Sequence, residues 1–567
     1  MEKIIRLNLT TGTINTEKKS ERYMKLGGRA LTGQMLLDEV DPACEPLGLR
    51  NKLIFAPGLL GGSYLSSSSR LSVGGKSPLT GGIKEANAGG TAAGALSKLG
   101  IKALIIEGES SLSYFQYLYV GKDKIELRPA EMAGQGVYSA AKLLFERYGD
   151  KVSLILIGPG GERGYCAAGI TNTDLQGRPS RFFGRGGLGA VMGVKGLKAI
   201  VLDPTGAEAI AYHDRKAFQE LNREIVKILR GNPMTGEVYP KYGTAAMATR
   251  TNAIHALPTR NFSAGSFECA NRIDGEYLHY VITSRGGVGE TTHSCMPGCL
   301  IKCSNVYPDA DGDELVAPLE YETIGLMGSN LSIGNLDDIA RLNYLCNDLG
   351  LDTIEMGATI GVAMDQGLIS FGDADGAIAL LGEVAADTIL GKVLGQGALI
   401  TGRVLGSRRI PVAKGQSMPA YDPRGVKGLG VTFATSPMGA DHTAGNTIRA
   451  EVDHSDPLPQ PSISRNAQPI AMIADSLGLC LMVVPAMVAH LDKLGKVCEY
   501  YCGLKISGDE LLSAAEKALQ VEREFNRRAG FSPAHDRLPE FMMDEPLPVT
   551  GNVFDVPLDE LKKMNEE

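Results

Sequence analysis

Short apolar runs, separated by glycine and other turn residues, follow one another through the first part of the chain, up to residue 205. Apolar runs bounded in this way are typical of buried strands. We expect a hairpin in "IIRLNLTTGTI" and strands in "NKLIFAPG", "KALIIEGES", "YFQYLYVGKDKIELRP", "VSLILIGPGG" and "LKAIVLDP". The first part of the chain is therefore predicted to be rich in strands.

After "LDPTG" the apolar positions recur with the period of a helix. Segment 214–230 begins with an aspartate that can cap a helix and is followed by Gly-Asn. Further helices are predicted over 336–349, 353–366, 376–391, 466–480 and 508–529. A glycine- and proline-bearing stretch, 415–430, marks a second boundary. The sequence thus predicts an α+β protein, with a β-rich N-terminal domain over 1–205 and two mostly α-helical domains over 206–415 and 416–567.

The composition, with 43% hydrophobic and 22% charged residues, is that of a soluble globular protein. A chain of 567 residues is too long for one hydrophobic core, so several domains are expected. The net charge of −8 and the lack of a Lys/Arg-rich block argue against nucleic acid as a partner. No apolar run reaches the roughly 18–20 residues of a membrane span. The charged start, "MEKIIRLNLTTGTI", lacks the apolar core of a secretory signal, so we expect a cytoplasmic protein without membrane insertion.

Three cysteines, Cys295, Cys299 and Cys303, lie at intervals of four in "HSCMPGCLIKC". Disulfides are rare in the cytosol, so cysteines at such short spacing indicate metal binding or catalysis. Pro297 and Gly298 should break regular helix between the first two, which lets the three thiolates converge. An iron–sulfur cubane needs four thiolates, so a fourth cysteine from elsewhere in the chain is required.

Two other interpretations of these cysteines stay open on spacing alone. Buried thiols can pack simply as small hydrophobic groups. A zinc site built from two cysteine pairs could combine Cys295 and Cys299 with Cys498 and Cys502 of "VCEYYC". The clustering favours a metal site over plain packing.

Two glycine-rich loops of the N-terminal part each carry an arginine. "GRGGLG" (184–189) matches a dinucleotide fingerprint, but "LQGRPSRFF" stands where a hydrophobic strand should precede it, so we do not expect NAD. What remains is a loop of backbone N–H groups beside Arg185, which suits phosphate. The stretch 66–90 adds Arg70 and Asn87. Either loop alone is typical of an ordinary turn, and together they indicate a bulky anionic cofactor.

The segments "NDLGLD" (347–352) and "DSLGLC" (475–480) echo one another. Each has the sequence of a helix C-cap, with glycine followed by leucine. A cap does not explain the polar residue three positions before each glycine, or the metal-capable residue two positions after it. Cys480 is therefore the candidate for the fourth thiolate.

Taken together, these motifs resemble the tungsten-dependent aldehyde:ferredoxin oxidoreductase family from end to end. "SRLSVGGKSPLTGG…NAGG", "GRGGLGAVMGVKGLKAIV", the cysteine trio, "LEYETIG", "NDLGLDT", "YDPRG", "GADH" and "DSLGLC" stand in the family's order. The resemblance implies a β-rich first domain that carries a bis-pterin cofactor, covered by two helical domains. Tungsten, or molybdenum in some members, would be held by the pterin dithiolenes without a protein ligand.

The resemblance also implies roles for individual residues. The pterin phosphates and their bridging Mg²⁺ would be held by Arg70, Asn87, Gly89, Arg185 and Gly186. One pterin would be recognised by Asn347, Leu351 and Asp352, and the other by Asp475, Leu479 and the surroundings of Cys480. A [4Fe–4S] cluster would be bound by Cys295, Cys299, Cys303 and Cys480. Beside the metal would lie His442 and a glutamate, either Glu320 or Glu322.

The activity that the resemblance implies is oxidation of an aldehyde to a carboxylic acid with oxygen from water. His442 or a glutamate would move protons, and electrons would leave through the cluster to ferredoxin or a partner subunit. These residues have another interpretation. The histidine would then be structural, and the glutamates would serve as charges at a helix N-terminus after Pro318. Rival functions are a catalytic subunit of a related complex, acting on another carbonyl or as a reductase, and a zinc-binding assembly protein. The assembly, a homo-oligomer or a hetero-complex, stays open.

Four positions depart from the family pattern. The first cysteine interval has three intervening residues where two are usual. Asn347 stands in place of an aspartate, and an amide accepts the same hydrogen bond without charge. Met438 replaces an arginine before "GADH". Arg341 stands where an acidic residue would bind a subunit-bridging metal, so we expect no such metal.

Overall fold

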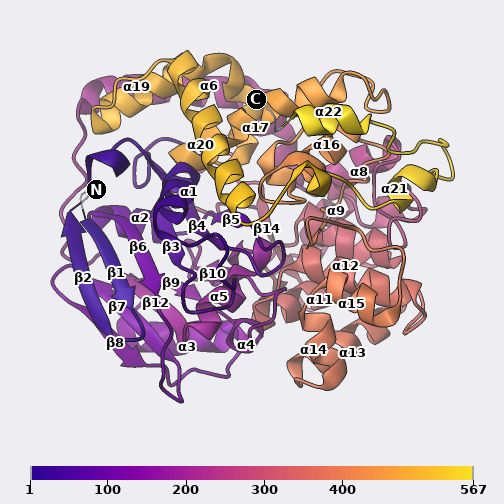
Figure 1. Ribbon diagram of the computed structural model, residues 1–567, viewed down its shortest axis with the longest axis horizontal. Coiled ribbons are helices and arrows are strands. Elements are labelled where there is room, and N and C mark those ends of the chain that lie inside the picture. Colours follow the sequence, from indigo (N-terminus) through magenta and orange to yellow (C-terminus); the bar gives the residue numbers. More distant parts are fainter. Residues whose placement is uncertain (1–2, 19, 565–567) are drawn as a thin grey trace.

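The computed structural model describes residues 3–18 and 20–564, so the predicted domain ends at residues 1–2 and 565–567 lie outside the described residues. Strands gather in the N-terminal part, and the later two thirds of the described chain is largely helical (Figure 1). The predicted α+β class is confirmed. No helix among the described residues is both long and apolar enough to cross a bilayer.

The first of two six-stranded sheets in the described residues has the order β2-β1-β6-β3-β4-β5. β1 and β6 are parallel, and every other neighbouring pair is antiparallel. Helices α1 (Gly28–Glu39) and α2 (Ala92–Lys98) contact this sheet. Its strands are β1 (Lys3–Asn8), β2 (Thr13–Lys18), β3 (Leu53–Pro57), β4 (Leu71–Lys76), β5 (Ile83–Ala88) and β6 (Ile101–Glu107).

The second sheet repeats this topology. Its order is β8-β7-β12-β9-β10-β11, again with one parallel pair, β7 and β12, in the equivalent place. The N-terminal part is therefore built from two halves of the same design, which the sequence analysis did not detect. The elements are β7 (Gln116–Gly121), β8 (Ile125–Pro129), α3 (Val137–Tyr148), β9 (Ser153–Leu156), α4 (Pro159–Glu162), β10 (Ile170–Asn172), β11 (Arg181–Phe183), α5 (Leu188–Val194) and β12 (Leu197–Asp203).

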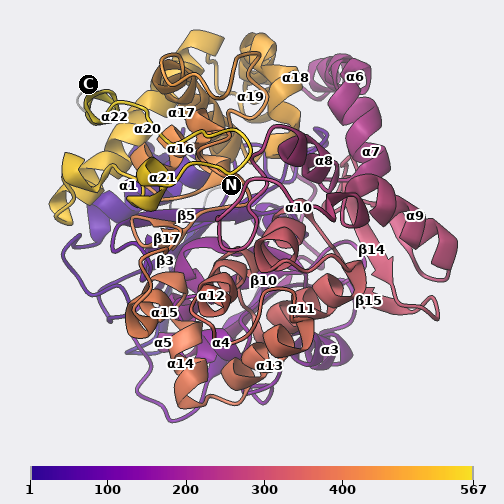
Figure 2. The same ribbon diagram turned by 90° about the vertical axis from the view of Figure 1, so that its right-hand side faces the viewer.

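The helical part forms two groups, and Figure 2 shows strands of the N-terminal sheets between them. One group contains α11 (Leu336–Leu349), α12 (Thr353–Asp365), α13 (Ala374–Ala385), α14 (Ile389–Gly395) and α15 (Ala398–Leu405). The other contains α16 (Lys427–Thr435), α17 (Gln460–Leu477), α18 (Val484–Met487), α19 (Leu491–Cys502) and α20 (Gly508–Arg528).

The remaining helices and strands lie outside the two sheets and the two helical groups. They are α6 (Arg215–Gly231), α7 (Tyr239–Tyr242), α8 (Ala246–Ala253), α9 (Gly275–Arg285), β13 (Glu290–His293), β14 (Ser304–Pro308), β15 (Glu314–Val316), α10 (Tyr321–Thr323), β16 (Val412–Ala413), β17 (Gln416–Ser417), α21 (Phe541–Asp544) and α22 (Leu558–Lys563).

Most predicted helices are present, with two changes. The helix predicted over 376–391 is divided into α13 and α14, because Asp387 between them has a left-handed φ of 55°. The helix predicted over 466–480 is α17, which begins at Gln460 and ends at Leu477. It stops there because Gly478, with φ 78°, forms a left-handed cap.

The hydrophobic cores do not follow the predicted domain boundaries. Phe218 and Leu229 of α6 share one buried cluster with Leu494 and Leu519 of the C-terminal helices, and α6 lies beside α19 in Figure 1. The predicted boundary at 415/416 falls in the turn between β16 and β17. The three domain limits stay predictions.

A buried ionic network joins the N-terminal part to the C-terminal helices. Arg29 on α1 is fully buried and donates hydrogen bonds of 2.8 and 2.7 Å to the two carboxylate oxygens of Glu522 on α20. It also lies 3.3 Å from Asp475 on α17. The guanidinium therefore compensates two buried carboxylates at once.

We expect Arg29→Ala to lower the free energy of unfolding by about 3–5 kcal/mol, because two carboxylates would stay buried without their cation. Urea denaturation followed by circular dichroism measures this change. The control is Arg528→Ala, which removes a guanidinium that is 53% exposed and bound to Glu524 on the surface. If both variants have the same urea midpoint of unfolding as the wild type, the buried ionic network does not hold the N-terminal part to the C-terminal helices.

Candidate active site

The three clustered cysteines and Cys480 come together, although they are far apart in the sequence. The trio lies on the loop between β13 and β14, which contains no helix among its described residues, as predicted from Pro297 and Gly298. The pKa of the Cys303 thiol is raised well above its usual value by burial and by the charges of Cys480 and Cys299. Cys303 therefore lies within electrostatic reach of both Cys299 and Cys480.

Two of these thiols, Cys295 and Cys299, influence one another's pKa. The Cys295 thiol donates to Cys299, which lowers the pKa of Cys299 to about 6 and raises the pKa of Cys295. Burial raises the pKa of Cys480. Thiols that ligate metal do so as thiolates, so a bound cation is what would allow these buried groups to lose their protons.

Loops of the N-terminal sheets surround the thiols. The Ser67 hydroxyl donates to Cys299 Sγ over 3.6 Å, and the backbone N–H of Cys480 donates to the Ser67 carbonyl over 2.8 Å. A Cβ atom at Gly89 would lie 2.9 Å from Cys295 Sγ, so only glycine permits this approach. Gly89 thus contacts a proposed cluster ligand directly.

The paired-zinc arrangement finds no geometric support. Cys498 is fully buried on α19, and the one thiol whose charge acts on it, among the described residues, is Cys502. No three His, Cys, Asp or Glu side chains in the described chain approach closely enough to ligate one metal ion. A cubane needs a wider set, because each thiolate binds a different iron.

The first predicted phosphate loop, in the stretch 66–90, is hydrogen-bonded to helix α17 of the second helical group. Arg70 donates to the side-chain oxygen of Asn87 and, over 2.9 Å, to its carbonyl. The Asn87 amide in turn donates to Asp475 over 3.0 Å. The Arg70 charge also acts on Asp475 and on Cys480, so this arginine lies between the predicted pterin contact and the thiols.

The second predicted phosphate loop holds a cation that is only partly compensated. Arg185 donates to the carbonyls of Ser417 and Ala440, and its Nη1 lies 3.6 Å from Asp352. Gly186 has a left-handed φ of 84°, and a Cβ atom there would lie 2.4 Å from Lys84. A strand, β11, does precede this loop, but it is three residues long and antiparallel to its neighbour, unlike a dinucleotide fold.

The two echoing segments bind equivalent loops of the two sheets. A Cβ atom on Gly58, after β3, would lie 2.2 Å from the nitrogen of Gly478, and one on Gly158, after β9, would lie 2.5 Å from that of Gly350. Only glycine permits these close approaches. The sheet duplication thus explains why the chain carries the LGL pattern twice, once for each half.

The remaining predicted pterin contacts lie on these segments. Leu351 forms an isolated antiparallel bridge with Ala168, which precedes β10, and Leu479 is buried beside Cys480. The Asn347 amide donates to the Tyr138 hydroxyl over 3.3 Å.

Several buried polar atoms near the second predicted phosphate loop have no hydrogen-bond partner. Arg185 Nε, Arg181 Nε and Asn172 Oδ1 are among them, while Arg185 Nη1 and Asp352 Oδ2, also without a hydrogen bond, form an ion pair with each other at 3.6 Å. Buried polar groups are nearly always paired, so an unpaired set of this kind indicates a polar ligand. The atoms fit the phosphates and ring nitrogens and oxygens of a pterin.

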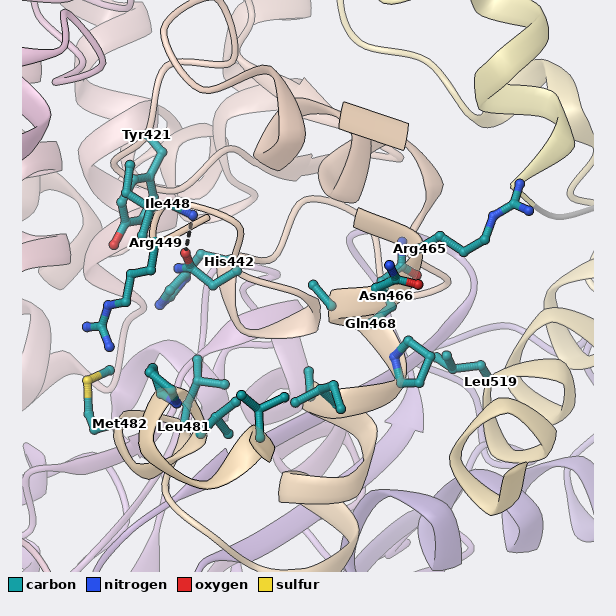
Figure 3. Close-up of a pocket in the computed structure, with 18 of the residues that line it drawn as sticks. Tyr421, His442, Ile448, Arg449, Arg465, Asn466, Gln468, Leu481, Met482 and Leu519 are labelled. Carbon is teal, nitrogen blue, oxygen red and sulfur yellow. Dashed lines mark hydrogen bonds between the residues drawn. The ribbon is translucent and has the colours of Figure 1, made fainter. Parts of the chain in front are cut away.

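A cavity of about 1000 Å³ is lined by both His442 and Glu322. Figure 3 shows His442 at this cavity. Glu322 accepts the Ala420 N–H at 2.8 Å with one oxygen, while its other oxygen lies 3.6 Å from His442 Nε2 and has no hydrogen-bond partner. Burial raises the pKa of Glu322, with the charge of His442 acting against it. The unpaired carboxylate oxygen thus lies near the imidazole without a hydrogen bond to it.

Glu320 also lines this cavity, but its charged partner is Arg181. Its carboxylate lies 3.6 Å from Arg181, is 38% exposed, and acts electrostatically on Cys303 and Cys480. Of the two glutamates that the sequence offered, the structure brings Glu322 to His442. Glu320 lies on the side of the thiols.

The sequence is similar to known proteins over nearly its whole length. The model "Aldehyde ferredoxin oxidoreductase, N-terminal domain" matches residues 4–204, and "Aldehyde ferredoxin oxidoreductase, domains 2 & 3" matches residues 220–567. The chain belongs to the aldehyde ferredoxin oxidoreductase family. It is an oxidoreductase of this family, as the motifs predicted.

Relatives of differing activity share this family's sequence or fold. The tungsten-containing aldehyde ferredoxin oxidoreductase of Pyrococcus abyssi is 34% identical over 97% of this chain and 92% of its own. The WOR-like subunit of an aliphatic sulfonate oxidoreductase from Pyrococcus furiosus is 26% identical over 79% of this chain and 76% of its own. The active-site complex BamBC of benzoyl coenzyme A reductase has the same fold, with a TM-score of 0.81, 19% identity, and coverage of 99% and 93%.

Two residues near the site were not singled out from the sequence. The ring of Tyr421, in the quoted "YDPRG", lies 6.1 Å from that of His442 and lines the same cavity. Arg181 acts on Cys295 and Cys303 and binds Ser304. Tyr421 belonged to a recognised motif, whereas nothing in the spacing around Arg181 marks it in this family.

Proposed function

We propose that this chain oxidises aldehydes to carboxylic acids on a bis-pterin tungsten cofactor, with water as the oxygen source. The observation that carries the proposal is the convergence of Cys295, Cys299, Cys303 and Cys480 beside a buried, unsatisfied polar region. The likeness to the tungsten-containing relatives supports tungsten as the metal, and molybdenum is the other candidate.

The residues around the unsatisfied region would hold the cofactor. Arg70, Asn87, Gly89, Arg185 and Gly186 would bind the pterin phosphates and a bridging Mg²⁺, and the two LGL segments would each recognise one pterin through Asn347, Leu351 and Asp352 or Asp475 and Leu479. The bound metal would accept the electron pair from the substrate. The four cysteines would hold a [4Fe–4S] cluster that carries electrons away singly.

Glu322 and His442 would handle the protons. Oxidation of an aldehyde consumes one water and releases two protons and two electrons. The unpaired oxygen of Glu322 would accept a proton from the reacting water, and His442 Nε2, 3.6 Å away, would pass it on. The cavity wall around them would limit access of bulk solvent.

The electrons would pass to ferredoxin or to an iron–sulfur partner subunit, as the names of the relatives indicate for those proteins. The test is anaerobic assay of the purified protein with an aldehyde panel and a viologen acceptor. We expect two one-electron viologens to be reduced for each acid formed. Reduction of the dye by another carbonyl or a sulfonate, with no acid formed from any aldehyde, would contradict the proposal.

A further inference from the structure

One arginine in the cavity has no anionic partner. Arg449 lines the cavity with His442, and in Figure 3 its side chain extends toward Met482. Within the described residues no hydrogen bond or ion pair reaches its guanidinium, and its nearest charge-compensating contact is the face of the Tyr239 ring, 4.9 Å away. This arginine stands out among the cations of the cavity.

Two other arginines line the cavity. Arg465 donates to the carbonyl of Lys563, and the charges of Glu522 and Asp536 act on Arg523, although its Nε has no hydrogen-bond partner. Burial alone lowers the pKa of Arg449 to about 10, with no carboxylate acting on it. The guanidinium therefore keeps its charge at neutral pH while it lacks a counter-ion.

Arg449 is half-buried, and a carboxylate bound in the cavity would supply the counter-ion that its guanidinium lacks. A ring at 4.9 Å supplies only part of that compensation. The cavity wall includes the apolar side chains of Met247, Leu481, Met482 and Val484, and Figure 3 shows Met482 on the side toward which Arg449 extends. Such a wall strengthens any charge pair formed inside it.

The loop that carries Arg449 is held in place relative to His442. Arg250 donates to the carbonyl of Ile448 over 2.8 Å, and the N–H of Ile448 donates to the side chain of Asn446 over 3.1 Å. The same segment, 442–449, thus presents the proposed proton-transfer group at one end and the unpaired cation at the other. Both side chains face one ligand volume.

We propose that Arg449 binds a carboxylate at the far end of the substrate, so that the enzyme prefers aldehydes bearing a second, anionic group. The inference rests on the proposed aldehyde oxidation, whose site it shares. A guanidinium binds a carboxylate with two parallel hydrogen bonds, and this geometry selects a planar anion. Tyr239 would keep the guanidinium oriented beneath it.

The test compares 4-carboxybenzaldehyde with 4-formylbenzamide, which has nearly the same shape but no charge. We expect wild-type kcat/KM to favour the carboxylate substrate, and Arg449→Gln to lower the ratio of the two values by at least about tenfold. Arg449→Lys should restore part of the ratio. Arg465→Gln, which changes another arginine of the same cavity, should leave the ratio as in wild type.

Equilibrium binding of terephthalate, measured by calorimetry, gives a readout that does not depend on turnover. We expect Arg449→Gln to weaken it by at least about tenfold with an unchanged melting temperature. If wild type oxidises both aldehydes equally, or if Arg449→Gln alters neither the ratio nor terephthalate binding, the inference is wrong while aldehyde oxidation stands. If neither aldehyde is oxidised but terephthalate binding depends on Arg449, the anion site stands and the proposed reaction fails.

Discussion

Cys480→Ala is expected to lose the iron–sulfur cluster and with it all electron transfer from the active site. The thiol of Cys480 lies with Cys299 and Cys303, and a cubane held by three remaining thiolates is exposed to loss of iron. The brown absorbance should bleach, and the iron content should fall from about four per chain. Absorbance spectra and iron analysis of anaerobically purified protein measure the effect.

Cys498→Ala is the matched control, because it also removes a buried thiol of the same hydrophobic cluster. That thiol is influenced by Cys502 and not by the trio, so the cluster should keep its iron. If Cys498→Ala bleaches the protein and Cys480→Ala does not, the ligand assignment is wrong.

Glu322→Gln is expected to lower kcat about 10²- to 10⁴-fold, the range typical of a lost general base. The amide cannot accept the proton that the unpaired carboxylate oxygen would take. Because the amide still fits beside the Ala420 N–H, the fold and cofactor content should be unchanged. Steady-state assay with an aldehyde and a viologen measures the loss, and metal analysis confirms the content.

The pH dependence of the catalytic rate tests the same role of Glu322. Burial raises the pKa of Glu322, while the charges of His442 and Arg185 lower it and that of Asp441 raises it. Since the carboxylate is the active form, the rate of wild type should rise with pH as Glu322 loses its proton, at a midpoint above the usual pKa of 4.5. Glu322→Gln should lack this rise. Glu320→Gln should keep it, and the reverse result would exchange the roles of the two glutamates.

The α+β class could be predicted from the sequence because the period of the apolar positions changes after residue 205. The cysteine trio and Cys480 could be proposed as ligands because thiols are rare in this chain and their spacing is informative, with ten in 567 residues. Glu320 and Glu322 could not be separated, because both stand in one short motif. Only the fold shows that Glu320 lies before helix α10 and faces Arg181, while Glu322 lies in its first turn and faces His442.

Features that depend on long-range packing were beyond the sequence analysis. The duplication of the sheets escaped notice because the halves share topology more than residues, although both keep glycine where Gly58 and Gly158 touch the LGL segments. The helix predicted over 376–391 is broken at Asp387, whose left-handed backbone carries no distinctive sequence signal. The sequence does not show that Arg449 lacks an anionic partner, because this depends on which side chains surround it in the fold.

The central claim is that four distant thiols hold a cubane next to a heavy-metal pterin centre. Elemental analysis of anaerobically purified protein tests it most directly. We expect about four irons and one tungsten or molybdenum per chain. Colourless protein that contains zinc and neither iron, tungsten nor molybdenum would contradict the account.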